Sequence, residues 1–356
     1  MAFSETIFLT GFPGFIAGRL VERLARPDIQ FYLLVQKRFV EQAMHDVEEI
    51  AARTGTPLEN FALVEGDITR ENLGIAGEDL ETIRAETTDI YHLAAAYDLA
   101  VPKSVAFAVN LEGTRHVNEF ARSVPQLNRY NYISTCYVAG KRDGTILESE
   151  LEHGAGFRNY YEETKYLAET EVERLKGELP VTIFRPSVVV GDSRTGEIPK
   201  YDGIYYLIHY LRRASGLLRL VNVGNRDVTL NLVPVDFVVD AIAALAKDEQ
   251  AVGKTVALAD PAPLTTGELF DAISEAMTGK RSAYTPPPDL VRWTLSRSFS
   301  PPLTGLPLSG VPYFFLSQNY NTSTADRLLS KHGIRCPGFK TYVGNLLKFV
   351  EAHPAL

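Results

Sequence analysis

Short, continuous runs of apolar residues alternate with longer segments of helical period in the first half of the chain. Such runs are typical of strands buried on both faces, and the periodic segments supply the helices that cover them. The expected strands are 6–10, 31–35, 61–64, 89–93, 131–134 and 181–184, and the expected helices are 15–25, 39–53, 105–122 and 160–176. The alternation predicts an α/β fold with a doubly wound parallel Rossmann sheet and a ligand crevice at the carboxyl ends of its strands.

The pattern changes after Gly191. One further helix and one further apolar run follow, at 237–246 and 255–258, and the remainder is irregular or rich in proline. We therefore expect a smaller, discontinuous C-terminal substrate-binding cap beside the Rossmann domain. The expected Rossmann domain is 1–191 plus about 231–261, and the expected cap is about 192–230 plus 262–356.

Prolines are dense between residues 284 and 313, which excludes long helices there. The segment suits a lid or, equally, a static surface loop. Aromatic residues of the cap suit either a long apolar pocket or its core, and burial in a core is the commoner use of large aromatic groups. They are Tyr201, Tyr205, Tyr206, Trp293, Tyr313, Phe314 and Phe315.

Composition and charge narrow the function classes. Hydrophobic residues make up 45% of the 356 residues and charged residues 22%, as in ordinary folded proteins. The 36 Lys and Arg residues are outnumbered by 44 Asp and Glu residues, and no basic run occurs, so no nucleic-acid partner is expected. No uninterrupted apolar stretch of 18 residues occurs, so no integral membrane span is expected.

The two cysteines, Cys136 and Cys336, form no CxxC pair, and the seven histidines form no metal-binding cluster. No metal site is therefore expected. Strand-like residues begin at Thr6, which leaves no room for a signal peptide and indicates a cytoplasmic protein. The sequence leaves a homodimer open.

A glycine turn joins the first expected strand to the first expected helix. Gly11 permits a tight turn, and Gly14 lets the backbone approach a pyrophosphate, whose charge the following helix N-terminus favours. Ala17 stands where a third glycine is common and can still pack closely on the strand. The turn predicts a dinucleotide site formed by Thr10, Gly11, Phe12, Pro13, Gly14, Phe15 and Ile16.

The end of the second strand selects the cofactor. NAD sites usually carry an acid there, which binds the ribose hydroxyls. This chain has Gln36, Lys37 and Arg38 instead. Two cations can neutralise a 2′-phosphate, and an arginine can bind it bidentately. The tip therefore favours NADP(H), although it would also suit a solvated helix start.

A Tyr-x-x-x-Lys pattern places a phenol and an ammonium on one helix face, where the cation can lower the phenol pKa for proton transfer. Two matches exist. Tyr137 and Lys141 span a strand-and-turn sequence and need not share a face. Tyr161 and Lys165 lie in a convincing helix that follows Thr135 at the end of a strand. We therefore interpret Thr135, Tyr161 and Lys165 as one catalytic unit, and expect Tyr161 and Lys165 to contact the cofactor as well.

The order of these motifs resembles the extended short-chain dehydrogenase/reductase family over about residues 5–260. The matching strings are TGFPGFIA (10–17), GDIT (66–69), HLAA (92–95), NLEGT (110–114), STCYVAG (134–140), YEETK (161–165) and RPSVVVG (185–191). The resemblance implies that Thr135 rather than Ser134 is the substrate-binding hydroxyl. It also implies further site residues: Asp67 and Ile68 beside the adenine, Ala94 and Ala95 along the cofactor, Asn110 in the proton relay, and Pro186 and Val189 near the nicotinamide.

Two shorter strings, GDIT followed by LGI (73–75) and VVVGDSRTGE (188–197), are similar to fatty acyl-CoA reductases and thioester reductase domains. That similarity implies an NADPH-dependent reductase of an acyl thioester, carried on CoA or on a carrier protein, which forms an aldehyde and then, in some members, an alcohol. The same catalytic unit would serve a ketone, hydroxysteroid, flavonoid-type or nucleotide-sugar substrate. A non-catalytic NADP-sensing protein is the third hypothesis, which the intact catalytic unit disfavours.

Three arginines, Arg212, Arg213 and Arg219, lie among leucines in the cap. They suit a CoA phosphate or a membrane surface, and a solvated amphipathic helix is the simpler interpretation.

Overall fold

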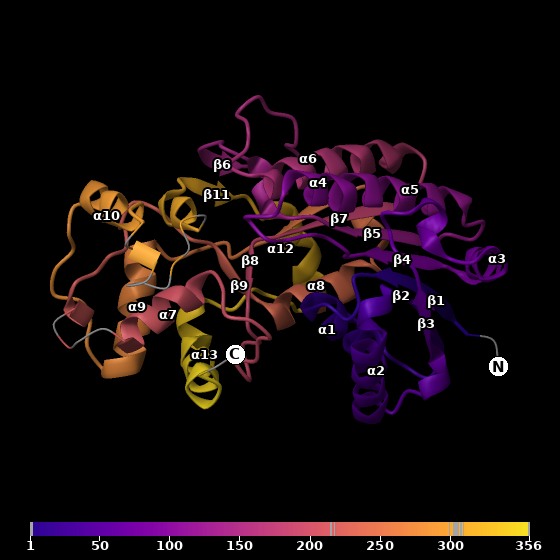
Figure 1. The fold of residues 1–356 in the computed structure, drawn as a ribbon, viewed down its shortest axis with the longest axis horizontal. Coiled ribbons are helices and arrows are strands. Elements are labelled where there is room, and N and C mark those ends of the chain that lie inside the picture. The colour runs from indigo at the N-terminus through magenta and orange to yellow at the C-terminus, as the bar shows by residue number, and fades with distance from the viewer. Residues whose placement is uncertain are drawn as a thin grey trace.

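The computed structural model describes residues 3–354 except for 214–215, 217, 299, 302–305, 307 and 309. Its centre is a seven-stranded parallel sheet (Figure 1) in the order β10-β7-β5-β4-β1-β2-β3. The strand order reverses between β1 and β4, which opens a crevice at their carboxyl ends. The strands are β1 (Glu5–Thr10), β2 (Ile29–Val35), β3 (Phe61–Glu65), β4 (Asp89–His92), β5 (Arg129–Ile133), β7 (Val181–Pro186) and β10 (Thr255–Leu258).

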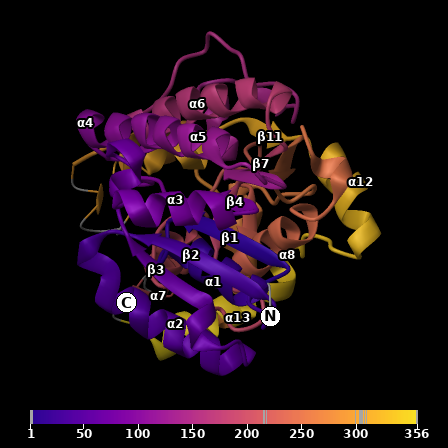
Figure 2. The ribbon, with the colours of Figure 1, turned by 90° about the vertical axis from the view of Figure 1, so that its right-hand side faces the viewer.

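Helices cover both faces of this sheet (Figure 2), so the predicted doubly wound α/β fold is confirmed. One apolar cluster joins the sheet to α1 (Phe15–Leu24), α2 (Val40–Thr54), α8 (Val235–Leu245) and α12 (Ser323–Leu329). The other joins it to α3 (Gly77–Glu86), α5 (Gly113–Ser123) and α6 (Tyr160–Glu173).

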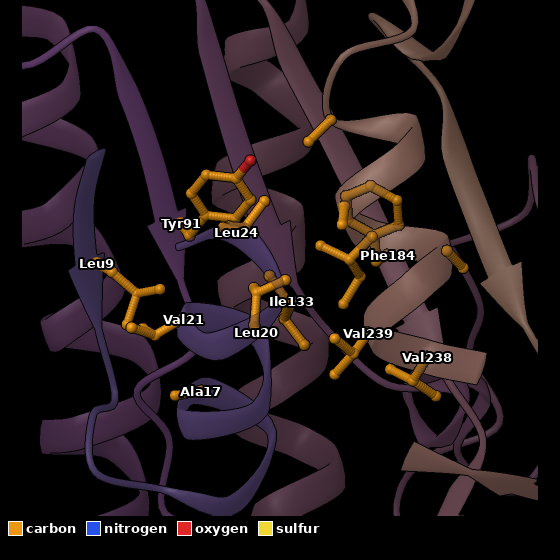
Figure 3. Packing of buried hydrophobic residues seen from close by; sticks show 14 of the residues in the cluster. Leu9, Ala17, Leu20, Val21, Leu24, Tyr91, Ile133, Phe184, Val238 and Val239 are labelled. Atoms are coloured by element: carbon orange, nitrogen blue, oxygen red, sulfur yellow. The ribbon is translucent and has the colours of Figure 1, made fainter. Parts of the chain in front are cut away.

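The amphipathic period of α1 explains its seat on the sheet. Leu20, Val21 and Leu24 are buried on one side of the helix, where they meet strand residues such as Leu9 and Tyr91 (Figure 3). Ala17, one turn earlier, is buried as well, and its small side chain lets the start of α1 lie close to the strands. The helix N-terminus is thereby fixed at the crevice.

The segment predicted as one helix over 105–122 is instead three pieces. It begins with α4 (Lys103–Ala106), passes through a π-helical segment (Phe107–Glu112), and continues as α5. A π segment shifts the side chains that follow it around the helix axis, and such insertions are frequent at functional sites. Asn110 lies inside this one.

The cap forms the other end of the molecule (Figure 1) and has a core of its own, which includes Tyr205, Phe270 and Leu346. This confirms the predicted smaller C-terminal cap. Within the described residues of the proline-rich segment, the helix α10 is eight residues long, in agreement with the expectation of no long helix there. Residues 299, 302–305, 307 and 309 of that segment lie outside the described ones. The cap helices are α7 (Ile204–Arg213), α9 (Thr266–Thr278), α10 (Pro288–Leu295) and α13 (Phe339–Ala352).

Two short strand pairs lie where the cap meets the main sheet region: one joins a cap strand to that region, and the other pairs the segments that flank residues 192–230. Strand β6 (Gly144–Ile146) pairs with β11 (Gln318–Tyr320), and β8 (Val188–Val190) pairs with β9 (Leu232–Pro234). Glu148 extends the first junction, because its buried carboxylate accepts hydrogen bonds from the backbone N–H groups of residues 257, 324 and 325. Within the described residues, no helix is both long enough and apolar enough to cross a membrane.

Candidate active site

The glycine turn brings β1, α1 and the end of β4 into close contact. Gly11 has φ +98°, and a Cβ atom there would lie 2.7 Å from the backbone nitrogen of Ala94. A Cβ atom on Gly14 would lie 2.7 Å from the Gly11 carbonyl oxygen. No side chain caps the start of α1. The turn therefore offers a close backbone approach beside free helix N–H groups, as a pyrophosphate requires.

A chain of hydrogen bonds through His92 connects this turn to the π segment. His92 Nδ1 lies 2.7 Å from the Thr10 hydroxyl, and Nε2 lies 3.0 Å from the Thr114 hydroxyl. Because the Thr114 hydroxyl donates to the Asn110 carbonyl, we assign the ring proton to Nε2, which donates to Thr114. Burial and the Lys165 charge lower the His92 pKa to about 3, so the ring is neutral. Sequence reasoning quoted His92 in a motif but gave it no role.

Asn110 fixes the loop after β4. Its side-chain oxygen accepts a hydrogen bond from the Ala96 N–H at 2.7 Å, and its amide donates to the Ala96 carbonyl at 3.1 Å. The amide also donates to the Thr164 hydroxyl of α6 at 3.0 Å. The side chain is 1% exposed. Asn110 therefore holds the cofactor crevice and the catalytic helix in a fixed relation, and the relay role implied by the resemblance stays a prediction.

Helix α6 presents Tyr161, Lys165 and Glu169 on one face, since they are spaced by four residues. The Lys165 ammonium donates to the Tyr132 hydroxyl at 3.0 Å and to the Ile133 carbonyl at 2.9 Å. Burial lowers the pKa of Lys165 to about 7, and the carboxylate of Glu169 opposes that shift. A lysine near neutrality at the end of β5 is an apt partner for proton transfer.

Thr135 and Tyr161 meet at the end of β5. Burial raises the pKa of the Tyr161 phenol to about 12, and the nearby Thr135 hydroxyl opposes that rise. The lowering of this pKa by Lys165, aided by the charge of a bound cofactor, stays a prediction, and the Lys165 ammonium donates to Tyr132 and to the Ile133 carbonyl. A phenol with this pKa stays protonated at neutral pH and can act as a proton donor.

The other Tyr-x-x-x-Lys match has a different geometry. Tyr137 lies in a 3-10 helix that ends at Gly140, whose φ is +58°. Lys141 follows this turn and is exposed, whereas the Tyr137 ring packs 4.7 Å from the ring of Tyr313. The two residues do not share a helix face, which leaves Tyr161 and Lys165 as the pair that does.

A buried ion pair supports the catalytic helix from behind. Arg185 Nε donates a hydrogen bond to Glu169 Oε1 at 2.8 Å. The Ser134 hydroxyl donates to the other carboxylate oxygen of Glu169. Arg185 also donates to the backbone carbonyl of Glu150 at 3.0 Å. Sequence reasoning missed this pair, although a charged residue in the apolar run 181–186 was a signal of it.

The cap reaches the start of α6 through Tyr313. Its hydroxyl donates to Glu162 Oε1 at 2.6 Å and accepts from the Asn159 amide at 2.7 Å. Glu162 directly follows Tyr161 and is fully buried. A cavity of about 20 Å³ lies beside this contact and beside Val188, the neighbour of Val189. The hydrogen bond between Glu162 and the cap was not predicted from the sequence. It is lined by Tyr137, Val188, Thr229, Leu230, Asn231, Tyr313, Leu316, Gln318 and Tyr320.

A groove of about 1110 Å³ runs from the ends of β2 and β3 toward α3. Its lining includes the predicted Gln36, Lys37, Arg38 and Asp67, and also Arg70, which sequence reasoning missed. The Gln36 amide donates to Asp67 at 3.0 Å, and Arg38 Nε donates to the Gln36 side-chain oxygen at 3.1 Å. The tip of β2 is therefore joined to the loop after β3.

The remaining predicted cofactor residues lie along the same edge of the sheet. Ile68 is buried, and its carbonyl lies 2.7 Å from His116 Nδ1. Ala94 and Ala95 follow β4, and Pro186 ends β7, while Val189 lies in β8 beyond it. The order of the strands thus arranges these residues on the path from the groove to Tyr161.

Two of the three cap arginines have structural partners. Arg212 donates to the carbonyl of Val350 at 2.8 Å, and Arg219 donates to the carbonyl of Leu211 at 2.8 Å. Both contacts lie near helix C-terminal ends, where cations are favourable. Of the cap aromatics, Tyr201 and Tyr205 are core residues, whereas Trp293 is 54% exposed.

Comparison with known proteins agrees with this arrangement. The model of a family described as male sterility protein matches residues 9–242. The chain is 28% identical over 281 residues to the fatty acyl-CoA reductase wat of Drosophila melanogaster, which covers 68% of this chain and 54% of that protein. It is 24% identical over 288 residues to a linear gramicidin synthase polypeptide of Brevibacillus parabrevis, which covers 76% of this chain and 5% of that protein. The chain spans about half the length of the reductase relative.

Solved structures show the same fold over the whole chain. The terminal R domain of the myxalamid PKS-NRPS pathway superimposes with a TM-score of 0.81 at 24% identity, covering 100% of this chain and 92% of that one. A thiolation-reductase di-domain of an archaeal non-ribosomal peptide synthetase gives 0.77 at 16% identity, covering 99% and 76%. The family match spans the glycine turn, the Tyr161 helix and α8, and the chain therefore belongs to the male sterility protein family, an extended short-chain dehydrogenase/reductase group that resembles the fatty acyl-CoA reductases.

Proposed function

We propose that this protein is an NADPH-dependent reductase that converts an acyl thioester to an aldehyde and free thiol. The observation that carries the proposal is the Thr135–Tyr161–Lys165 cluster, two hydroxyls and an ammonium at the carboxyl end of β5. The fatty acyl-CoA reductase relatives and the thiolation-reductase neighbour support a thioester as the substrate class.

The crevice suits a nicotinamide dinucleotide, because the close packing at Gly11 and Gly14 keeps the turn tight and no side chain caps the N-terminus of α1. Lys37 and Arg38 favour the 2′-phosphate of NADP, since the tip of β2 carries cations where NAD proteins usually carry an acid. Bound NADPH would supply the hydride. Side chains of the protein would bind the carbonyl oxygen and supply the proton.

Those side chains divide the work on the thioester carbonyl. Negative charge develops on its oxygen during reduction, and the hydroxyls of Thr135 and Tyr161 are available to donate hydrogen bonds to it. Tyr161 transfers its proton to that oxygen, and Lys165 stabilises the phenolate that results. The hemithioacetal then breaks its carbon–sulfur bond and releases aldehyde and thiol. A second reduction of the aldehyde would give an alcohol by the same residues.

A carrier protein or CoA can deliver such a thioester. The solved thiolation-reductase neighbour and the gramicidin synthase relative favour a carrier-bound acyl group, and the fatty acyl-CoA reductase relatives favour CoA. Both share the phosphopantetheine thioester that Thr135 and Tyr161 would address.

The test is to follow NADPH oxidation and thiol release together, with acyl-CoA and acyl-carrier-protein thioesters and with matched aldehydes and ketones. We expect thiol release equal to NADPH oxidation in the first step, and its loss in Tyr161→Phe. Tyr160→Phe is the matched control, because Tyr160 precedes it on α6 and is 41% exposed. Oxidation with ketones but never with thioesters would refute the thioester proposal, and turnover with none of the substrates would favour a binding protein.

A further inference from the structure

The loop between β3 and α3 contains three consecutive residues in the left-handed region. Asn72, Leu73 and Gly74 have φ values of 50°, 58° and 65°. Glycine adopts this conformation freely and asparagine tolerates it, but for a leucine it is an outlier that strains the backbone. Such strain persists only where the surroundings determine it.

The surroundings hold this turn in several ways. The Leu73 side chain is fully buried, and its carbonyl accepts the Asp67 N–H at 2.7 Å. A Cβ atom on Gly66 would lie 2.6 Å from the same carbonyl oxygen, so the turn rests directly on the end of β3. Arg84 of α3 donates to the Asn72 side-chain oxygen at 3.3 Å. The loop is therefore one rigid piece that fixes both Asp67 and Arg70.

Arg70 lies in this turn with its aliphatic stem over Gly74. A Cβ atom on Gly74 would lie 3.2 Å from Arg70 Cδ, so the absence of a side chain there leaves the space that the stem occupies. The residue is exposed and lines the same groove as Lys37 and Arg38. No ion pair to its guanidinium is found in the part of the chain that the structure describes.

The acids of the groove do not neutralise this site. Asp67 is the acid closest along the chain, and its two oxygens accept from Thr69 at 2.9 Å and from Gln36 at 3.0 Å. Three cations from two segments thus face one groove, which Glu65, Asp67 and Asp79 also line, and among the described residues none of the three cations forms an ion pair within 4.0 Å. A dianionic phosphate fits this arrangement, because a guanidinium binds phosphate through two parallel hydrogen bonds.

We propose that Arg70 is a specificity-determining residue that binds the 2′-phosphate of NADP from the β3 side of the groove, opposite Lys37 and Arg38. The strained turn at residues 72–74 holds the Arg70 side chain in the groove. This inference rests on the proposed function, since it requires NADP to be the preferred cofactor. NAD has a hydroxyl in place of the phosphate and offers Arg70 no charge to bind.

The test is to measure the dissociation constants of NADP⁺ and NAD⁺ by calorimetry for the wild type and Arg70→Gln. A hydrogen-bonded charge pair at this site makes the expected loss of NADP⁺ affinity roughly 10- to 100-fold, with NAD⁺ affinity changed less than about twofold. Arg70→Lys keeps the positive charge but loses the two parallel N–H donors of the guanidinium, so we expect an intermediate loss of NADP⁺ affinity. Arg213→Gln, on an exposed surface of the cap, is the matched control for removing one positive charge.

A double-mutant cycle tests the turn. Gly74→Ala would push on the Arg70 stem and strain a backbone of φ +65°, so we expect a reduced NADP⁺ preference. In the Arg70→Gln background the same change should leave the ratio of the two dissociation constants unaltered, because the turn acts on that ratio through Arg70.

The outcomes separate the two proposals. A wild type that binds NAD⁺ as tightly as NADP⁺ would refute the proposed cofactor and the inference with it. A wild type that prefers NADP⁺, with an unchanged ratio in Arg70→Gln, would overturn the inference alone. Equal weakening of both cofactors would also overturn it, because Arg70 would then support the fold or the adenine and not the phosphate.

Discussion

The two ends of the crevice are built in opposite ways. At the Tyr161 end, which comprises Tyr161, Thr135 and Lys165, the polar groups lie on a helix and a strand end and are bonded to other protein groups. At the Lys37 end, which comprises residues 36–38 and Arg70, exposed cations lie on loops with unused hydrogen-bonding capacity. The polar groups of the first end therefore have partners within the protein, whereas the cations of the second form no ion pair among the described residues.

This difference follows from what each end must do. A proton donor works only if its geometry is fixed before the reaction, and burial makes each hydrogen bond around it matter more. Phosphate recognition needs only opposite charge and a fork of donors, which exposed side chains supply when the ligand arrives. Substitutions at the Tyr161 end should therefore change turnover or stability, and changes at the Lys37 end should alter affinity.

The largest expected effect is on turnover. Lys165→Met should lower kcat by about 10²- to 10⁴-fold, the usual contribution of a positioned acid–base system. Lys141→Met, in the exposed second match of the same pattern, should leave kcat within about twofold. Steady-state NADPH oxidation with a thioester measures both. A similar loss in the two variants would contradict the assignment of the pair on α6.

The next effect is on stability. Glu169→Gln leaves the Arg185 guanidinium buried without its carboxylate, which should cost about 3–5 kcal/mol in the free energy of unfolding. Urea denaturation measures this cost. Glu171→Gln is the control on the same helix, because its ion pairs are on the surface and contribute about 1 kcal/mol or less. Equal stability of the two variants would show that the Tyr161 end does not depend on the buried pair.

The pH dependence of reduction should follow Lys165. Its pKa is lowered to about 7, so the ammonium is present below pH 7 and is lost as the pH rises through that value. Because the charged form supports the reaction, kcat/KM should fall about tenfold per pH unit above 7. Lys165→Arg keeps its charge throughout and should remove this falling limb, even at a lower rate. If kcat/KM of the arginine variant still fell above pH 7, the pH dependence would belong to a group other than Lys165.

A smaller effect is expected where the cap contacts the catalytic helix. Tyr313→Phe removes the hydroxyl that donates to the buried Glu162, which should cost about 1–3 kcal/mol of stability. Tyr284→Phe, at a tyrosine that is 60% exposed, should change stability by about 0.5 kcal/mol or less. Thermal or urea unfolding distinguishes them, and a neutral Tyr313→Phe would show that the contact is not a stabilising one.

The smallest effect is that of ionic strength. The exposed cations of the Lys37 end interact with a phosphate across water, and the Debye length falls from about 10 Å at 0.1 M salt to about 3 Å at 1 M. NADP⁺ affinity should therefore weaken with salt while kcat at saturating cofactor stays nearly constant. A kcat that fell with salt in parallel with affinity would remove the distinction between the ends.

The sheet and the glycine turn were predictable because their signals are local. Continuous apolar runs specify the strands, and the positions of Gly11 and Gly14 specify the turn. The π segment could not be predicted in this way, since the periodicity of 105–122 is compatible with an ordinary helix and no pattern shows the bonds that Asn110 makes to Ala96.

The paired short strands were missed for a related reason. Strands β6, β8, β9 and β11 have three residues each, and their pairing is a tertiary contact between distant segments. Among the site residues, the strand ends indicated Thr135 and the helix indicated Tyr161. Arg70 gave no such signal, because a left-handed turn that contains a leucine does not follow from residue preference.

Helix α12 has a consequence for how the chain folds during synthesis. Its Ala325, Leu328 and Leu329 belong to the same apolar cluster as β10 and α8, although they lie more than 60 residues beyond β10. A ribosome releases the sheet residues well before these three emerge. Until then this part of the apolar face of the nascent protein stays uncovered, so the core on this side of the sheet is completed only late in synthesis.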